Sequence, residues 1–128
     1  MRISHISLYV RNLEKMCNFY QIYLDAKIKY KNYNDKQELI NCFLVFSGSV
    51  NIEFIQVCND AENHSRLNFL GLNHIGFLLE SINEVDRLCL RLEQNKYTKL
   101  EGPQYKNNGF YAARFLDPES NMIEITAA

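Results

Sequence analysis

Residues 3–10 read Ile-Ser-His-Ile-Ser-Leu-Tyr-Val, and residues 72–80 return to the same pattern as Leu-Asn-His-Ile-Gly-Phe-Leu-Leu-Glu. In both stretches apolar positions alternate with others, as in a β-strand that buries one face. His5-Ile6 in the first stretch matches His74-Ile75 in the second. This correspondence predicts a chain built from two equivalent halves.

Each of these strands is followed by a predicted helix. Apolar residues recur at helical spacing after Asn12, a plausible N-cap, and that helix should end near Asp25. Ser81 and Glu84 form the sequence pattern of a capping box, and the helix that they open should stop near Asn95. Both halves therefore begin with a strand and a helix.

Turn residues divide the rest of each half into three strands. The expected ranges are 27–34, 39–47 and 50–58 in the first half, and 98–105, 109–117 and 121–127 in the second. Residues 1–58 and 72–128 then form two modules, each strand, helix, strand, strand, strand. A polar linker at 59–71 joins them, and His64 within it is read as a solvated loop residue.

The composition is typical of one globular domain, and it gives no indication of a strongly charged binding partner. Fourteen Lys and Arg residues nearly balance 15 Asp and Glu residues, and the net charge of −1 gives no field that would attract nucleic acid or an anionic membrane. No apolar run approaches the roughly 20 residues that span a bilayer, and the N-terminus lacks a signal-peptide pattern. The cysteines are far apart, which favours buried, reduced thiols in a cytoplasmic protein: Cys17, Cys42, Cys58 and Cys89.

Two glutamates stand within apolar strands at matching places of the repeat. Glu53 lies in Ile52-Glu53-Phe54-Ile55, and Glu124 lies in Ile123-Glu124-Ile125-Thr126. Strand alternation turns each acid away from the face that packs on the helix, toward the face that also carries the matching histidine. No basic residue recurs in step with both acids. Because a buried carboxylate needs a partner, a divalent cation bound by both histidines and both glutamates would satisfy all four groups.

The predicted ligands are His5, Glu53, His74 and Glu124. Two imidazoles and two carboxylates suit first-row ions such as Zn, Ni, Co, Mn or Fe, and they leave positions open for substrate oxygens. Four further residues are candidates for lining the substrate pocket: Tyr9, Phe46, Tyr111 and Arg114. Alternation puts Tyr111 and Arg114 on opposite faces, so at most one of them lines it. Arg114 could contact a carboxylate or phosphate, or form a surface ion pair.

Longer motifs give the chain a resemblance to the vicinal oxygen chelate superfamily, which includes glyoxalase I, bleomycin-resistance proteins and extradiol dioxygenases. The resemblance spans the chain and is carried by residues 3–6, 13–20, 71–77 and 115–125. The last of these, Phe-Leu-Asp-Pro-Glu-Ser-Asn-Met-Ile-Glu-Ile, is similar to the family pattern D-P-[DE]-G-N-x-I-E. Ser120 replaces the usual glycine, a departure that would strain the turn but leave Glu124 in place.

The resemblance implies an α+β fold in which two tandem βαβββ modules form an open, U-shaped mixed sheet. It also implies a metal-dependent, lactoylglutathione lyase-like enzyme that acts on a small oxygenated substrate chelated to the ion. By analogy Glu124 is the first choice for moving the proton and Glu53 the second. A thiol co-substrate and a homodimer are further expectations, and the site would lie within one chain or across two.

Other superfamily activities remain open on the sequence alone. They are fosfomycin-type thiol transfer, epimerisation and ring cleavage, although two modules are short for the common four-module ring-cleaving dioxygenases. A non-catalytic drug- or metabolite-binding module is a further alternative. So is a cleft lined by these four polar residues without any metal, because motif matches carry false positives.

Overall fold

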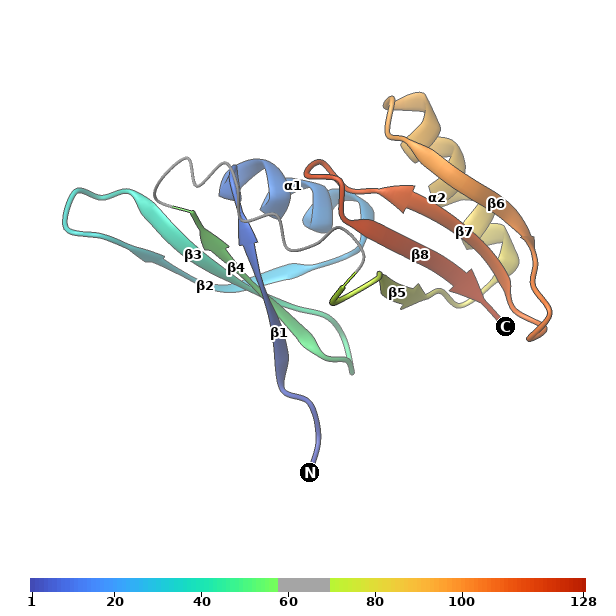
Figure 1. Ribbon diagram of the computed structural model, residues 1–128, viewed down its shortest axis with the longest axis horizontal. Helices are drawn as coiled ribbons and strands as arrows, with labels where there is room; N and C mark the ends of the chain where they lie inside the picture. Colours follow the sequence, from blue (N-terminus) through green and yellow to red (C-terminus); the bar gives the residue numbers. More distant parts are fainter. Residues whose placement is uncertain (58–69) are drawn as a thin grey trace. The chain divides into compact units, whose positions relative to one another are not determined.

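The computed structural model describes residues 1–57 and 70–128, and the chain divides into two compact units, residues 1–64 and 65–128 (Figure 1). The first unit contains β1 (His5–Val10), α1 (Leu13–Tyr23), β2 (Lys27–Tyr33), β3 (Leu39–Val45) and β4 (Asn51–Gln56). The second contains β5 (Ile75–Leu78), α2 (Ile82–Gln94), β6 (Lys99–Tyr105), β7 (Tyr111–Leu116) and β8 (Met122–Ala127). This order confirms the prediction of two tandem βαβββ modules.

Each module forms its own four-stranded mixed sheet. The strand order is β1-β4-β3-β2 in the first and β5-β8-β7-β6 in the second. The first strand of each module pairs in parallel with the last, and the other pairs are antiparallel. A parallel pair needs a long connection, which α1 and the two strands after it provide in the first module and α2 with its strands in the second.

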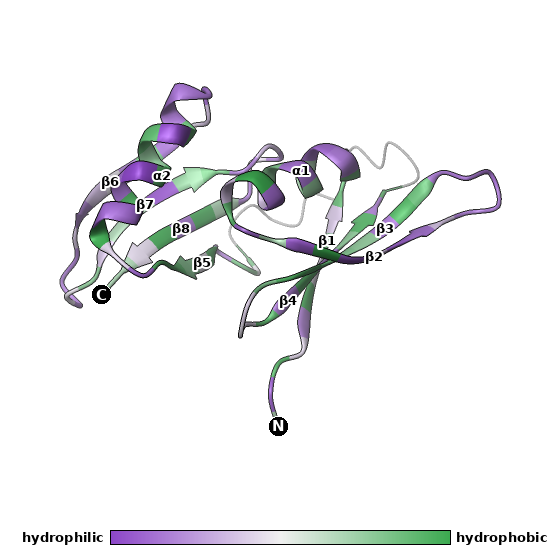
Figure 2. Ribbon diagram, turned by 180° about the vertical axis from the view of Figure 1, so that it is seen from behind, coloured by the Kyte–Doolittle hydropathy of each residue, from purple (hydrophilic) through white to green (hydrophobic). Residues whose placement is uncertain are grey.

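One face of each sheet is closed by its helix. The buried side of α1 consists of Leu13, Met16, Cys17, Phe19 and Tyr20, and that of α2 of Val85, Leu88, Cys89 and Leu92. Beneath them lie the buried strand residues Ile52 and Phe54 in the first module, and Ile123 and Ile125 in the second. Hydrophobic and hydrophilic residues alternate along these strands in Figure 2. Each sheet is therefore left with a second face on which polar residues stand.

The predicted helix ends are close to those observed. The Asn12 side chain accepts a hydrogen bond from the backbone N–H of Lys15, and the Ser81 hydroxyl accepts one from that of Glu84. The capping box is closed differently from the standard pattern, because the Glu84 carboxylate accepts from the N–H of Glu80 at 3.1 Å. Asn95 caps the end of α2, as predicted.

Several predicted boundaries are wrong by a few residues. The fifth strand was expected at 72–80 but spans only Ile75–Leu78, because its parallel pairing with β8 runs from Ile75 opposite Ile123 to Leu78 opposite Thr126. His74 therefore precedes the strand instead of lying in it. The expected burial of three thiols, Cys17, Cys42 and Cys89, is confirmed. Cys58, His64 and most of the predicted linker lie outside the described residues.

Candidate metal-binding site

In the first module, His5 and Glu53 lie on the sheet face opposite α1. β1 and β4 run parallel with Ser7 opposite Glu53, so His5 is two residues before the position that faces the acid, on the same side of the strand. Ser7 Oγ donates to Glu53 Oε1 at 2.6 Å, and Asn41 Nδ2 donates to Oε2 at 2.9 Å. Both donors are neutral. Among the described residues, no cation balances the charge of Glu53.

Asn41 contributes a second feature to this half of the site. Its Oδ1 is buried and accepts no hydrogen bond within the described residues, although its Nδ2 binds Glu53. An unsatisfied buried acceptor costs free energy, so an electropositive group near this oxygen would be favoured. The neighbouring Phe43 ring lies 5.5 Å from the His5 ring, centroid to centroid, and stacks on Tyr30 at 5.0 Å. The face around Glu53 is thus polar at the acid and aromatic beside it.

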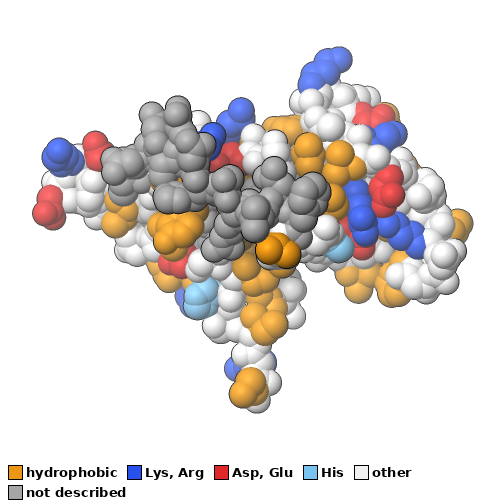
Figure 3. Space-filling model, viewed as in Figure 1, with side chains coloured by type: hydrophobic (Ala, Val, Ile, Leu, Met, Phe, Trp, Pro, Cys, Tyr) orange, Lys and Arg blue, Asp and Glu red, His pale blue; other side chains and the backbone are white. Residues whose placement is uncertain are grey.

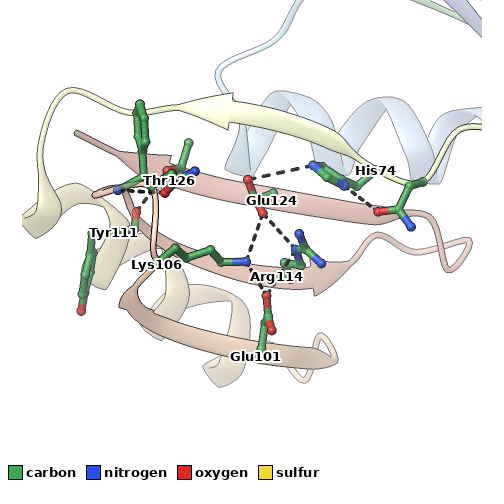
Figure 4. A network of polar contacts seen from close by, with 10 residues as sticks. His74, Glu101, Lys106, Tyr111, Arg114, Glu124 and Thr126 are labelled. Atoms are coloured by element: carbon green, nitrogen blue, oxygen red, sulfur yellow. Dashed lines mark hydrogen bonds and ion pairs between the residues drawn. The ribbon is translucent and has the colours of Figure 1, made fainter.

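In the second module, His74 and Glu124 face each other directly (Figure 4). His74 Nε2 is 4.0 Å from Glu124 Oε1, and His74 Nδ1 is 2.7 Å from the side-chain oxygen of Asn73. An amide oxygen only accepts, so the proton of a neutral His74 must lie on Nδ1. The lone pair of Nε2 then points toward a carboxylate oxygen. Two hydrogen-bond acceptors that face each other are stabilised when a proton or a cation lies between them.

The other oxygen of Glu124 is held by cations. Arg114 Nε donates to Oε2 at 2.9 Å, and Lys106 Nζ lies 3.4 Å from the same atom. Both cations also contact Glu101 Oε1, at 2.6 Å from Lys106 and 3.3 Å from Arg114. Figure 3 shows basic, acidic and histidine side chains gathered over the second sheet. These four charges form a balanced network, hereafter the Glu124 network: Glu101, Lys106, Arg114 and Glu124.

The network fixes the ionisation of both acids. Burial alone would raise the pKa of Glu124, but the hydrogen bond from Arg114 and the charges of Lys106, Arg114 and His74 outweigh it, so the pKa lies below its usual value. The hydrogen bond from Lys106 is the main reason that the pKa of Glu101 is also lowered. Glu124 is therefore a carboxylate at neutral pH.

The sequence predicted that no basic residue recurs in step with both glutamates, and this is correct. It did not predict that Glu124 alone has basic partners. Phe43 lies opposite Glu53 where Arg114 lies opposite Glu124, so no basic residue recurs in step with both. The repeat gave no sign that Glu124 has two cations of its own. Lys106 and Glu101 were missed because they come from β6 and its hairpin, where the register shifts between Glu101 and Gln104. The alternation rule fails across such an irregularity.

Each module brings one predicted histidine and one predicted glutamate together on one face. Among the described residues there is no group of three or more His, Cys, Asp or Glu side chains arranged to hold a metal ion. That all four predicted ligands meet at one ion stays a prediction.

The other pocket candidates differ in position. Tyr9 shares the strand face of His5 and is 73% exposed. Tyr111 points to the helix side, where its hydroxyl donates to Asp86 at 2.7 Å, so Arg114 is the one of that pair on the glutamate face. An open hollow of about 440 Å³ lies at the β6–β7 hairpin, and Lys106 is part of its wall. Its other walls are Gln104, Tyr105, Asn107 and Asn108.

Comparison with a family model places residues 2–125 in a match described as Glyoxalase/Bleomycin resistance protein/Dioxygenase superfamily. None of the curated proteins is similar enough to the chain to count as a match. Within the described part of the chain, no helix has the length and apolar character needed to cross a membrane.

Solved structures share the fold at low sequence identity. A glyoxylase/bleomycin resistance protein/dioxygenase domain from Frankia sp. EAN1pec is 24% identical with a TM-score of 0.75, covering 100% of this chain and 92% of that one. A family enzyme from Burkholderia phytofirmans PsJN is 22% identical with a TM-score of 0.73, covering 97% and 96%. A lactoylglutathione lyase from Agrobacterium tumefaciens is 19% identical with a TM-score of 0.71, covering 99% and 93%.

Proposed function

Because the chain belongs to the glyoxalase/bleomycin resistance protein/dioxygenase superfamily, we propose that it is a metal-dependent lyase or isomerase of the lactoylglutathione lyase type. It would act on a small oxygenated substrate chelated to a divalent ion held by His5, Glu53, His74 and Glu124. One observation carries the proposal. Each module places a histidine and a glutamate on the sheet face that the helix leaves uncovered: His74 faces Glu124 at 4.0 Å, and His5 lies two residues before the position opposite Glu53.

The residues present fit a divalent ion in chemistry and in hydrogen bonding. Nε2 of His74 and Oε1 of Glu124 face each other at 4.0 Å, and neither has another partner among the described residues. Arg114 and Lys106 occupy only Oε2. Carboxyl oxygens and imidazole nitrogens bind Zn at about 2.0–2.2 Å, and a second hydrogen bond to each ligand, here from Arg114 and to Asn73, is typical of metal sites.

Glu53 fits the same role from the other module. Its two hydrogen bonds come from Ser7 and Asn41, which orient the carboxylate without neutralising it. The unpaired Oδ1 of Asn41 adds electronegative character beside it. The net charge on this face therefore favours a cation, whereas the charges of the Glu124 network already balance.

The chemistry divides between the ion and the protein. When bound, the ion polarises a substrate oxygen and stabilises the negative charge that develops there. Glu124 would accept a proton from the carbon beside that oxygen and return it to the neighbouring carbon, as base and then as acid. Arg114 keeps the carboxylate ionised and oriented for the first step. Glu53 is the second choice for this role.

A non-catalytic binding module is the second candidate, and the Glu124 network is the observation that favours it. A carboxylate already paired with Arg114 and Lys106 has less need of a metal ion. Thiol transfer, epimerisation and ring cleavage stay alternatives within the superfamily. The homodimer and the cytoplasmic location stay predictions.

Metal content and turnover measured on the same samples separate these functions. We would determine bound Zn, Ni, Co, Mn and Fe by elemental analysis of the full chain, and then measure isomerisation of the methylglyoxal–glutathione hemithioacetal. His5→Ala, Glu53→Gln, His74→Ala and Glu124→Gln should each weaken metal binding and abolish turnover. Glu80→Gln is the control, because that exposed side chain lies outside the site.

The outcomes point to different conclusions. Metal binding with turnover that depends on the four residues supports the lyase. Intact metal with no turnover of this or related hemithioacetals favours another superfamily activity. Absence of metal binding in the wild type overturns the proposal and leaves the binding module.

A further inference from the structure

Arg114 uses only one edge of its guanidinium group in the Glu124 network. Its Nε contacts Glu124 Oε2 at 2.9 Å and Glu101 Oε1 at 3.3 Å. Within the part of the chain that the structure describes, neither terminal nitrogen forms a hydrogen bond, and Nε is the atom through which Arg114 contacts both glutamates. The side chain as a whole is 28% exposed. Two donor nitrogens in a fixed fork are thus available beside Glu124.

Further polar groups accompany this free end. Lys106 Nζ lies on the same face, 3.4 Å from Glu124 Oε2, and its side chain is only 23% exposed (Figure 4). Gln104 pairs with Ala112, two residues before Arg114 on β7, and so shares its side of the sheet. Lys106 and Gln104 also line the open hollow of about 440 Å³ at the hairpin. The free end of Arg114 therefore has a second cation and polar side chains on its side of the sheet.

The fold itself does not require an arginine at this place. Phe43 holds the equivalent position in the first module, where it lies opposite Glu53 as Arg114 lies opposite Glu124. Glu53 is accommodated there by two neutral donors alone. A half-buried cation with an unused donor edge is better explained by recognition of an anion than by the needs of the sheet.

We propose that the terminal nitrogens of Arg114, assisted by Lys106, bind a planar carboxylate or a phosphate of the substrate. A guanidinium fork matches two oxygens of such a group at once, which a lysine does not. The substrate is then a small acid instead of a neutral carbonyl compound. This assignment of substrate class rests on the proposed function, because it places the acid next to Glu124. The anion binding itself requires no metal.

The test measures anion binding to the metal-free full chain by isothermal titration. The probes are malonate, its uncharged analogue malonamide, and inorganic phosphate. Arg114→Lys keeps the positive charge and loses the fork, and it should raise the Kd of the preferred anion about tenfold or more. Arg114→Met should remove binding. Lys99→Met is the matched control, because Lys99 pairs with Glu93 on the helix side of the chain's second module, and it should change nothing.

A further variant gives a result that a merely structural arginine would not. Glu101→Gln removes a competing carboxylate 2.6 Å from Lys106 Nζ and 3.3 Å from Arg114 Nε, so it should tighten anion binding. A preference for malonate assigns a carboxylate substrate, and a preference for phosphate assigns a phosphorylated one. Equal anion binding by wild type and Arg114→Lys, or equal binding of malonamide and malonate, would overturn the inference. If the chain binds anions through Arg114 but binds no metal, the inference about Arg114 is supported and the lyase proposal is overturned.

Discussion

Phe43 and Arg114 occupy equivalent positions of the two modules, each paired across antiparallel strands with the glutamate of the final strand. Phe43 forms an aromatic contact with His5, whereas Arg114 forms an ion pair with Glu124. One backbone plan thus gives two different surroundings for the same acid. Glu53 keeps an unbalanced negative charge, and Glu124 is held between cations. The two glutamates are therefore expected to respond differently to substitution.

A fall in pH should destabilise the metal-free wild-type protein more than it destabilises the Glu124→Gln variant. The pKa of Glu124 in the folded chain is lowered, whereas in the unfolded chain a glutamate titrates at about 4.3. As the pH falls, the unfolded state takes up its proton first. The stability that Glu124 contributes is therefore present above about pH 4.3 and is lost as the pH falls through the folded pKa.

Urea unfolding at a series of pH values between about 6 and 3 would measure this loss. The free energy of unfolding should fall less steeply for Glu124→Gln than for wild type. Glu80→Gln should follow the wild type. Parallel curves for wild type and Glu124→Gln would contradict the role given to Arg114 and Lys106.

Ser120→Gly should stabilise the protein. Ser120 has a φ of 66°, a left-handed conformation that strains a residue with a side chain, in the turn where the sequence pattern already predicted strain. The turn itself is fixed by Asp117, whose Oδ1 accepts from the backbone N–H groups of Glu119 and Asn121. Relief of the strain should exceed the added entropy of the unfolded glycine, for a net gain of up to about 1 kcal/mol. The measurement is urea unfolding at neutral pH, with Ser120→Ala as the control that keeps the strain.

The hydrogen bond between Tyr111 and Asp86 should appear in the titration of the phenol. Chiefly this bond, together with burial and the negative charge of Asp86, raises the pKa of Tyr111 to about 12. Because the folded pKa is raised, the stability from this contact is complete below the ordinary tyrosine pKa and is lost as the pH rises through 12. Asp86→Asn should return the pKa of Tyr111 toward about 10. The ultraviolet difference between each protein and its Tyr111→Phe counterpart isolates this one phenol.

The repeat and the local signals were sufficient to predict most of the fold. The histidine–isoleucine pairs located the first strand of each module, and Asn12, Ser81 and Asn95 marked helix ends that the structure confirms. Such signals act over a few residues, so they can be read directly from the chain. The length of β5 could not be predicted from such local signals, because it depends on how far the pairing of β5 with β8 extends.

The candidate site was predictable only in part for the same reason. Alternation correctly placed both glutamates opposite the helix, since the strands that carry them are regular. The partners of Glu124 arise across strands, from an antiparallel neighbour and from a hairpin beyond an irregular stretch of β6. Long side chains such as Lys106 reach such positions without any fixed sequence spacing. Asn73 was also passed over, although it directly precedes the predicted ligand His74.

Asn73→Ala should weaken metal binding without unfolding the chain. The Asn73 oxygen, 2.7 Å from Nδ1 of His74, holds the proton on that nitrogen and turns the Nε2 lone pair toward Glu124. Without it both tautomers become available, and the imidazole ring is free to turn. The loss of a partner of this kind costs about 10- to 100-fold in metal affinity. Asn73 is exposed, so the free energy of unfolding of the metal-free protein should change little.

Competition with a chelator of known affinity would measure the zinc Kd of wild type, Asn73→Ala and Asn73→Asp. The carboxylate introduced by Asn73→Asp would keep an acceptor at Nδ1, so that variant should restore most of the affinity. Asn83→Ala, on α2, is the control for removing an amide away from the site. If Asn73→Ala binds zinc as tightly as the wild type, Nε2 of His74 is not the atom that meets the ion. The pairing of His74 with Glu124 would then be an ordinary ion pair formed when the imidazole is protonated.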